Sequence, residues 1–513
     1  MNKQSIIDLL ESRGFLNDSG RTQLHQYTTP NLHSLLRQST GNRNNVGWVR
    51  GEYVIYTQSQ DEELDDLLAG WYRETASYKN QYLILETIDG QFKMFDSDCN
   101  LIAENEEIEK RLSMSNSNTS RYGYFLPAIR TKPFLLLAGI SGTGKSQIVK
   151  EMAFVSCPDI DDLRKDAVSP GNYCLIEVKP NWHDSIELLG YDSAIKKRYV
   201  VTKFVKFVVK AMRYPNVPFF VCLDEMNLAP VEQYFAEFLS VLESRKLVAG
   251  HIISEPLIDK SFFKNNLVAL DLFDLPASEY KSLANVTGVE QNDDALGENA
   301  GIWHKLQDEG LCLPQNLIVI GTVNMDETTH QFSRKVIDRA MTFEMNQADF
   351  RGYFADNVNL NYVNKEDVLP KKMFLAKNVR GIDAFNNNPQ IGDAFIELIV
   401  KKLEEINCIL IGTPFRIAYR VQNELILYFF ELLEEVEQAN KDWDVVFYLA
   451  LDDIMMMKVL PRIEGDDDLL GTKDNGILYE LHNFAQTNNL GKSAKKIEEM
   501  LSRLSSHFTS FWP

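Results

Sequence analysis

Short, strongly apolar runs alternate with helix-like stretches through the middle of the chain. The apolar runs occupy residues 134–138, 173–178, 217–223, 316–323 and 340–344. Runs of this length are typical of strands buried on both faces of a parallel sheet, with helices providing the crossover connections. The pattern therefore predicts an α/β fold, a parallel sheet flanked by helices, over residues 129–347. Within it, residues 231–247 have the spacing of one amphipathic helix.

The two ends of the chain have different patterns. Residues 1–128 contain strand-like stretches at 47–56 and 81–86 with a helix-like stretch between them, which predicts a small α+β N-terminal domain. From residue 348 to 513 the spacing is mostly helical and predicts a helical lid and C-terminal domain. Residues 249–312 are acid-rich and weakly periodic, and are expected to be an insertion in the α/β domain.

The first apolar run opens directly into the pattern G-x-x-x-x-G-K-S, followed by helical spacing at 147–154. A glycine-rich turn between a strand and a helix directs backbone N–H groups and the positive helix N-terminus at a phosphate. Lysine in this pattern reaches the β- and γ-phosphates, and the last hydroxyl contacts Mg²⁺. The residues expected to bind a nucleoside triphosphate are Gly139, Ser141, Gly142, Thr143, Gly144, Lys145, Ser146 and Gln147.

Polar residues follow two other predicted strands. Asp224 and Glu225 end the run at 217–223, and successive strand residues point to opposite sides. One acid can therefore hold Mg²⁺, together with Ser146, while its neighbour activates the attacking water. We assign Asp224 to the metal and Glu225 to the water. Asn324 ends the run at 316–323 and is expected to orient the same water.

Composition limits the classes of protein that fit. The 513 residues suggest about two to four domains. A formal net charge of −20 argues against a globally basic nucleic-acid binder, although it leaves room for a local basic groove. No apolar run is long enough to cross a bilayer, and the six cysteines lack paired spacing. We therefore expect a cytoplasmic protein with no membrane partner.

In order along the chain, these features resemble the AAA+ superfamily and, within it, the McrB-like branch, the motor subunits of modification-dependent restriction systems. The segments that carry the resemblance, beyond the phosphate loop, are Leu223-Asp224-Glu225-Met226-Asn227-Leu228-Ala229, the loop at 182–191, Gly321-Thr322-Val323-Asn324-Met325-Asp326, and Lys458-Val459-Leu460-Pro461-Arg462-Ile463. The resemblance covers residues 125–470.

The resemblance implies a ring, expected to be a hexamer, that hydrolyses ATP or GTP with Mg²⁺ at its subunit interfaces. Arg339 would be the arginine supplied to the neighbouring subunit's γ-phosphate, with Arg334 as the alternative. Arg420 would contact phosphate from the lid, with Arg416 as the alternative. DNA, including modified DNA, would be recognised by the N-terminal domain and cleaved by a separate McrC-like nuclease subunit.

Several alternatives stay open. Members of the branch that prefer GTP have an M-N-x-x-D-R-type segment, whereas Asn324 is followed here by Met325-Asp326-Glu327-Thr328, so ATP and GTP both fit. A MoxR-like ATPase that remodels a protein partner would share the same motifs, with residues 1–128 binding that protein. A nucleotide-gated scaffold that barely hydrolyses is the third alternative.

Overall fold

The computed structural model describes residues 122–196, 198–276, 296–325, 333–346, 360–437, 443–472, 474–504 and 507–512, together with four strands between residues 53 and 104. The chain divides into two compact units. The first comprises Met1–Gly123 with Leu433–Asp442, and the second comprises Tyr124–Leu432 with Trp443–Pro513. The α/β part and the helical C-terminal part, which the sequence predicts as separate domains, belong together to the second unit.

The first unit contains a four-stranded sheet in the order β1-β2-β3-β4. Its strands are β1 (Tyr53–Thr57), β2 (Tyr82–Glu86), β3 (Phe92–Phe95) and β4 (Leu101–Glu104). The first pair is parallel and the other two are antiparallel. The strands expected near 47–56 and 81–86 are therefore confirmed in part as β1 and β2. The helix expected between them lies outside the described residues.

The second unit is built on a five-stranded sheet in the order β15-β5-β14-β9-β6, and every neighbouring pair is parallel. Its strands are β5 (Phe134–Gly139), β6 (Tyr173–Glu177), β9 (Phe219–Asp224), β14 (Leu317–Asn324) and β15 (Met341–Glu344). All of β5, and all of β14 except Asn324, is buried. This burial explains the continuous apolar runs and confirms the predicted α/β fold with a parallel sheet.

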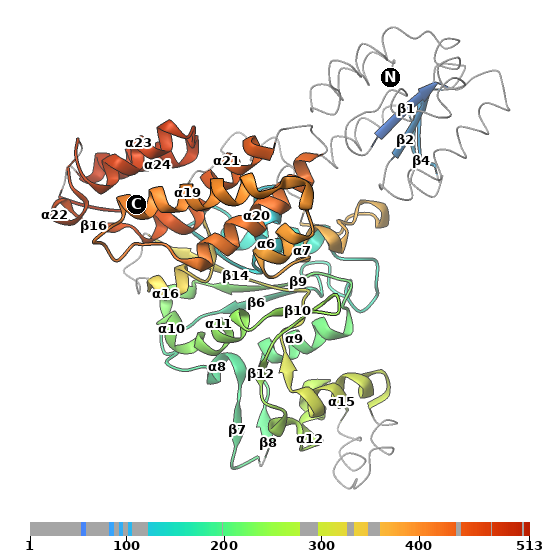
Figure 1. Ribbon diagram of the computed structural model, residues 1–513. Coiled ribbons are helices and arrows are strands. Elements are labelled where there is room, and N and C mark those ends of the chain that lie inside the picture. Colours follow the sequence, from blue (N-terminus) through green and yellow to red (C-terminus); the bar gives the residue numbers. More distant parts are fainter. Residues whose placement is uncertain are drawn as a thin grey trace. The chain divides into compact units, whose positions relative to one another are not determined.

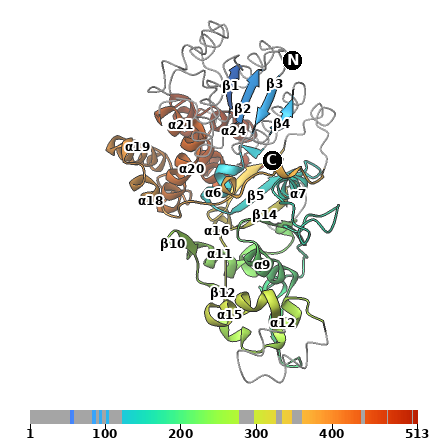
Figure 2. The same cartoon turned by 90° about the vertical axis from the view of Figure 1, so that its right-hand side faces the viewer.

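Helices lie on both sides of this sheet (Figures 1 and 2). They include α6 (Leu126–Thr131), α7 (Lys145–Val155), α8 (Ile186–Leu189), α9 (Lys203–Arg213), α10 (Val231–Tyr234), α11 (Ala236–Glu243) and α16 (Arg334–Ile337). The prediction of a single helix at 231–247 is wrong. It is interrupted at Phe235, whose ψ of 5° is not helical, and its last residues form strand β10 (Lys246–Val248).

The acid-rich insertion has secondary structure of its own. After β10, a turn with positive φ at Ala249 and Gly250 leads back into β11 (His251–Ile253). Such a turn matches the twist of a two-stranded hairpin, so the chain folds locally here. The rest of the insertion comprises β12 (Pro256–Ile258), α12 (Leu267–Leu272), α15 (Ala300–Glu309) and β13 (Leu311–Cys312). A second hairpin joins β7 (Tyr191–Ser193) to β8 (Arg198–Val200).

The C-terminal part is helical, as predicted. Its main helices are α18 (Gly381–Asn386), α19 (Asp393–Ile409), α20 (Tyr419–Glu437), α21 (Trp443–Ile454), α23 (Ile477–Thr487) and α24 (Gly491–Leu504). Helix α21 ends at Ile454, and the chain continues as a π turn (Met455–Val459) and a 3₁₀ turn (Leu460–Arg462). Pro461, which has no N–H to donate, lies inside this 3₁₀ turn. None of the described helices is long and apolar enough to cross a membrane.

A buried ionic cluster links the helical part to the amino edge of the sheet. The Glu424 carboxylate of α20 lies 2.7 Å from Lys132, just before β5, and 2.7 Å from Lys458, which is fully buried. Lys458 also donates to the backbone oxygens of Asp338 and Ala340, just before β15, at 2.7 and 2.8 Å. These buried charges are stabilised by one another and not by water, so separating them is costly. The cluster therefore holds the helical part against the strands β5 and β15.

Candidate active site

The register of the sheet brings the predicted site residues to one edge. Asn324, the last residue of β14, is opposite Gly139, the last residue of β5. On the other side of β14, Gly321 is opposite Leu223, the residue before Asp224. Because all the strands are parallel, the loop after β5, the acids after β9 and the asparagine after β14 meet at the carboxyl edge, where α/β proteins bind ligands.

The phosphate-loop residues have the conformation that the motif requires. Gly142 and Gly144 have φ of +82° and +81°, and a Cβ at either position would meet no atom within 4 Å. The backbone conformation, and not the available space, therefore explains these glycines. Gly144 precedes α7, and no side chain among the described residues caps the N-terminus of this helix. Its first N–H groups can therefore face an anion.

Lys145 folds back over the loop. Its ammonium donates to the carbonyl oxygens of Gly139 at 3.0 Å and Ile140 at 2.7 Å, and the residue is only 5% exposed. A phosphate oxygen is a stronger, charge-assisted acceptor than a carbonyl. The lysine is therefore already placed over the loop where a bound phosphate would lie. Ser141, Thr143 and Gln147 lie on the same loop and first turn, as the sequence predicts.

Gly139 is required by a close approach. A Cβ at this position would lie 2.3 Å from the backbone oxygen of Met345 and 2.7 Å from Oδ1 of Asn346, just after β15. Oδ1 of Asn346 in turn accepts a hydrogen bond from the Ile140 N–H, at 3.1 Å. The chain after β15 thus braces the start of the phosphate loop.

Replacing Gly139 with alanine is expected to weaken nucleotide binding by about tenfold or more, because relieving a backbone overlap costs about 1–3 kcal/mol. The matched control is Gly301→Ala, at a helical position of α15 where a Cβ meets nothing within 4 Å. Equilibrium binding of a fluorescent nucleotide compares the two variants. Binding by Gly139→Ala that equals that of the control would refute the bracing role of this contact.

Ser146, Asp224 and Thr322 form a hydrogen-bonded group beside the loop. Oγ of Ser146 donates to Oδ1 of Asp224 at 2.5 Å, and Oγ1 of Thr322 donates to the same oxygen at 2.7 Å. In the described part of the chain, no three His, Cys, Asp or Glu residues gather as a metal site. One hydroxyl and one carboxylate are nevertheless the donors that Mg²⁺ uses when phosphate and water complete its shell, so these residues fit that ion.

Glu225 has a strained backbone. Its φ and ψ are +52° and +49°, a left-handed conformation that is unusual for a residue with a long side chain. The conformation is held by its backbone N–H, which donates to Oγ1 of Thr322 at 3.0 Å. Nδ2 of Asn324 donates to Oε1 of Glu225 at 3.2 Å. Backbone strain of this kind is concentrated at active sites, and here it directs the carboxylate toward Asn324.

Three residues of the site were missed by sequence reasoning. Thr322 holds both acids, and the signal for it was a hydroxyl inside an otherwise apolar run. Asn227 donates to the backbone oxygen of Asn324 at 3.2 Å, and Asn346 holds Ile140. Asn227 stood in a quoted motif without a role. Asn346 had no signal in the sequence, because its position depends on β15 lying beside β5.

The predicted arginines are not brought to this edge within one chain. Arg339 and Asp338 come just before β15, so they lie at the amino edge of the sheet, opposite the phosphate loop. Arg420 pairs with Asp338, and its Nε lies 3.1 Å from Glu243. Arg334 lies 3.5 Å from Glu464, and its guanidinium is over the ring of Phe415 at 4.8 Å.

The arginines differ in whether a carboxylate occupies their side chains. The side chains of Arg339 and of the exposed Arg416 have no polar partner among the residues that the structure describes. Arg420, by contrast, is occupied by two carboxylates. The guanidinium groups of Arg339 and Arg416 therefore remain available for contacts beyond the described residues, whereas Arg420 forms a structural ion pair.

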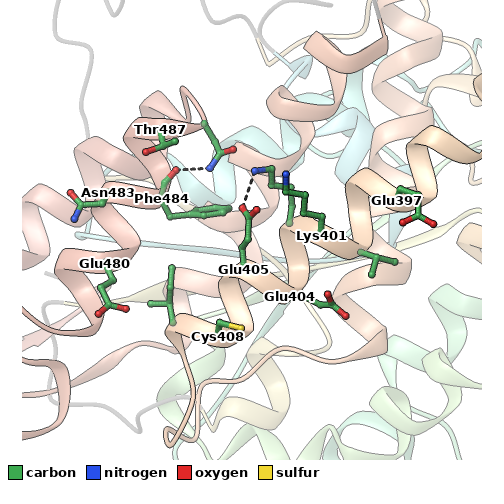
Figure 3. Close-up of a pocket in the computed structure, with 13 residues that line it drawn as sticks. Glu397, Lys401, Glu404, Glu405, Cys408, Glu480, Asn483, Phe484 and Thr487 are labelled. Atoms are coloured by element: carbon green, nitrogen blue, oxygen red, sulfur yellow. Dashed lines mark hydrogen bonds and ion pairs between the residues drawn. The ribbon is translucent and has the colours of Figure 1, made fainter.

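A groove of about 740 Å³ lies elsewhere, between α19 and α23 (Figure 3). Glutamates such as Glu397, Glu404 and Glu480 line it together with lysines. Lys402 and Glu405 pair across 2.8 Å, and the Asn488 amide donates to the backbone oxygen of Phe484. The groove shares no residue with the phosphate-loop site and contains no comparable set of catalytic groups.

Comparisons with known proteins give limited guidance. A family model described as a domain of unknown function (DUF8727) matches residues 376–508, which contain α18 to α24. The search of curated proteins finds no match. A solved structure of a candidate ATPase from Cytophaga hutchinsonii is 14% identical, with a TM-score of 0.34, covering 67% of this chain and 93% of its own. A similarity that low does not establish a shared fold.

Proposed function

We propose that this chain is an AAA+ nucleoside triphosphatase. The observation that carries the proposal is the continuous hydrogen-bonded group at the carboxyl edge. It runs from Ser146 of the phosphate loop through Asp224 and Thr322 to Glu225 and Asn324. Phosphate binding, metal binding and water activation need these groups side by side, and they come from three adjacent strands.

Each residue has a distinct role in hydrolysis. The loop N–H groups, the α7 N-terminus and Lys145 bind the β- and γ-phosphates. Ser146 and Asp224 would hold Mg²⁺, which neutralises charge on the phosphate oxygens when bound. Glu225 accepts the proton of the attacking water, and Asn324 orients that water and the Glu225 carboxylate. The γ-phosphoryl group leaves with the water oxygen, and the nucleoside diphosphate keeps the bridging oxygen.

A second copy of the chain would complete the site. Arg339 lies at the opposite edge of the sheet from the loop of its own chain, so it can reach a γ-phosphate only across an interface. This placement supports a ring oligomer, in which a guanidinium from one subunit stabilises charge in the site of the next.

Complementation between variants tests this arrangement. Arg339→Ala is expected to lower turnover by about 10³-fold and to leave nucleotide binding unchanged. Mixing it with Glu225→Gln should restore part of the activity, because some interfaces then combine an intact base with an intact arginine. Lys335→Ala, an exposed neighbour on α16, is the control and should retain full activity. If the mixture is no more active than its separate components, Arg339 does not act between subunits.

At the finer level, we propose that the protein is the motor of a McrBC-like restriction system. The segments at 223–229, 182–191, 321–326 and 458–463 support this branch, with DNA recognised by the N-terminal domain and cut by a separate nuclease. Hydrolysis of ATP and GTP, measured with and without methylated DNA, tests the proposal. Stimulation by methylated DNA is expected. Hydrolysis with no DNA response and no DNA binding by the full chain would favour a remodeller of proteins instead.

A further inference from the structure

A series of polar contacts connects the phosphate loop to the C-terminal helix α24. The Ile140 N–H donates to Oδ1 of Asn346, at 3.1 Å. The amide nitrogen of Asn346 donates to Oε1 of Glu344, at 2.6 Å. The same carboxylate oxygen accepts a hydrogen bond from the ammonium of Lys496, on α24. Three side chains therefore bridge elements that are more than a hundred residues apart in the sequence.

At the α24 end of this series of contacts, the side chain of Lys496 is held in place. Lys496 is 4% exposed, and its ammonium lies over the ring of Phe511, 4.6 Å from its centre. The start of α24 is held by Asp452, whose carboxylate accepts hydrogen bonds from the N–H groups of Lys492 and Ser493, at 2.9 and 2.8 Å. A buried ammonium on an anchored helix has little freedom, so its position determines where the Glu344 carboxylate lies.

The near end meets the loop at its first turn. The Met345 N–H donates to the Ala138 oxygen at 2.7 Å, which extends the β15–β5 pairing to the edge of the loop. The Asn346 amide must keep its nitrogen toward the carboxylate of Glu344, which leaves its oxygen for the Ile140 N–H. If the Glu344 carboxylate moved away, the Asn346 amide could rotate. Its NH₂ group would then face the Ile140 N–H, and two donors cannot form a hydrogen bond.

We propose that Lys496 and Glu344 are positioning residues that set the affinity of the phosphate loop for nucleotide through Asn346. This inference rests on the proposed nucleotide binding and adds its regulation: movement of α24 changes the loop, and nucleotide in the loop stabilises α24. The two effects are reciprocal, because a coupling between two sites acts equally in both directions.

Binding of a fluorescent ATP or GTP analogue to the full-length protein tests the proposal. Lys496→Met and Asn346→Ala are each expected to raise the dissociation constant by about fivefold or more, a typical size for such coupling. The dissociation constant of the double variant should be no higher than that of the weaker-binding single variant, because both changes interrupt the same series of contacts. Lys495→Met, an exposed neighbour on α24, is the control and should bind as the wild type does.

A second readout separates coupling from general damage. Hydrogen exchange of the α24 amides should slow when nucleotide binds to the wild type and should not respond in Asn346→Ala, even though that residue is not on the helix. If Lys496→Met does not fold, Glu344→Gln replaces it in the same cycle. Turnover in each variant should show a raised KM with kcat unchanged, since the groups around Glu225 are untouched.

The outcomes distinguish the two proposals. A wild-type protein that binds neither nucleotide overturns the proposed function. A wild-type protein that binds nucleotide overturns only the coupling if Lys496→Met, or its replacement Glu344→Gln, binds equally well. Additive losses in the double variant would also overturn it, because they would mean that the two residues act independently.

Discussion

Glu225→Gln is expected to lower nucleotide turnover by about 10²–10⁴-fold, the usual contribution of a general base, while nucleotide binding stays intact. The amide keeps the shape of the carboxylate but cannot accept the proton of the attacking water. Phosphate release at saturating nucleotide measures the loss, and equilibrium binding measures what is retained.

The matched control for this substitution is Glu232→Gln, an exposed acid a short distance along the chain on α10, which should leave turnover unchanged. The strained backbone at residue 225 makes the comparison informative, because glutamine can keep the hydrogen bond from its N–H to Thr322. Turnover by Glu225→Gln within about twofold of the wild type would mean that another group activates the water.

Glu424→Gln is expected to destabilise the second unit by about 3–5 kcal/mol, the usual effect of removing one partner from a buried ion pair. The carboxylate lies between the ammonium groups of Lys132 and Lys458. Lys132 would keep Glu243, at 2.8 Å, whereas the fully buried Lys458 would lose its carboxylate partner. Burial raises the pKa of Glu424, but the two lysines lower it more, so the net shift is downward and the group is ionised. Burial also lowers the pKa of Lys458, which the Glu424 charge opposes.

Urea unfolding followed by tryptophan fluorescence measures this loss of stability. The control is Glu404→Gln on α19, where the carboxylate is exposed and its removal should change stability by less than about 0.5 kcal/mol. Equal stability of the two variants would show that the cluster contributes little to the attachment of the helical part.

The sequence was sufficient for the parts of the fold that depend on local pattern. The apolar runs became the five strands of the sheet, of which the edge strand β6 is only partly buried. The motif glycines and acids lie at the carboxyl edge because they end or directly follow their strands. The helix expected at 231–247 was wrong because its periodicity continues past Phe235, where the backbone bends, into the hairpin that Ala249 and Gly250 create.

Features that depend on the order of strands in the sheet could not be predicted from the sequence pattern. Asn346 contacts the loop only because β15 pairs with β5, although β9 and β14 intervene between those strands along the chain. The pairing of Arg420 with Asp338 and Glu243 likewise joins three distant elements, and nothing in the spacing of these residues indicates it. The assignment of this arginine to phosphate came from the resemblance to the AAA+ superfamily and not from the spacing of these residues.

The central claim is that the carboxyl edge around Gly139–Ser146 hydrolyses a nucleoside triphosphate. The most direct measurement is the steady-state release of phosphate from ATP and from GTP by the wild-type full-length protein, with and without Mg²⁺. On the proposed ring arrangement, in which a second copy supplies an arginine, we predict release that requires Mg²⁺ and rises more steeply than linearly with protein concentration. No release from either nucleotide, at any protein concentration, would contradict it.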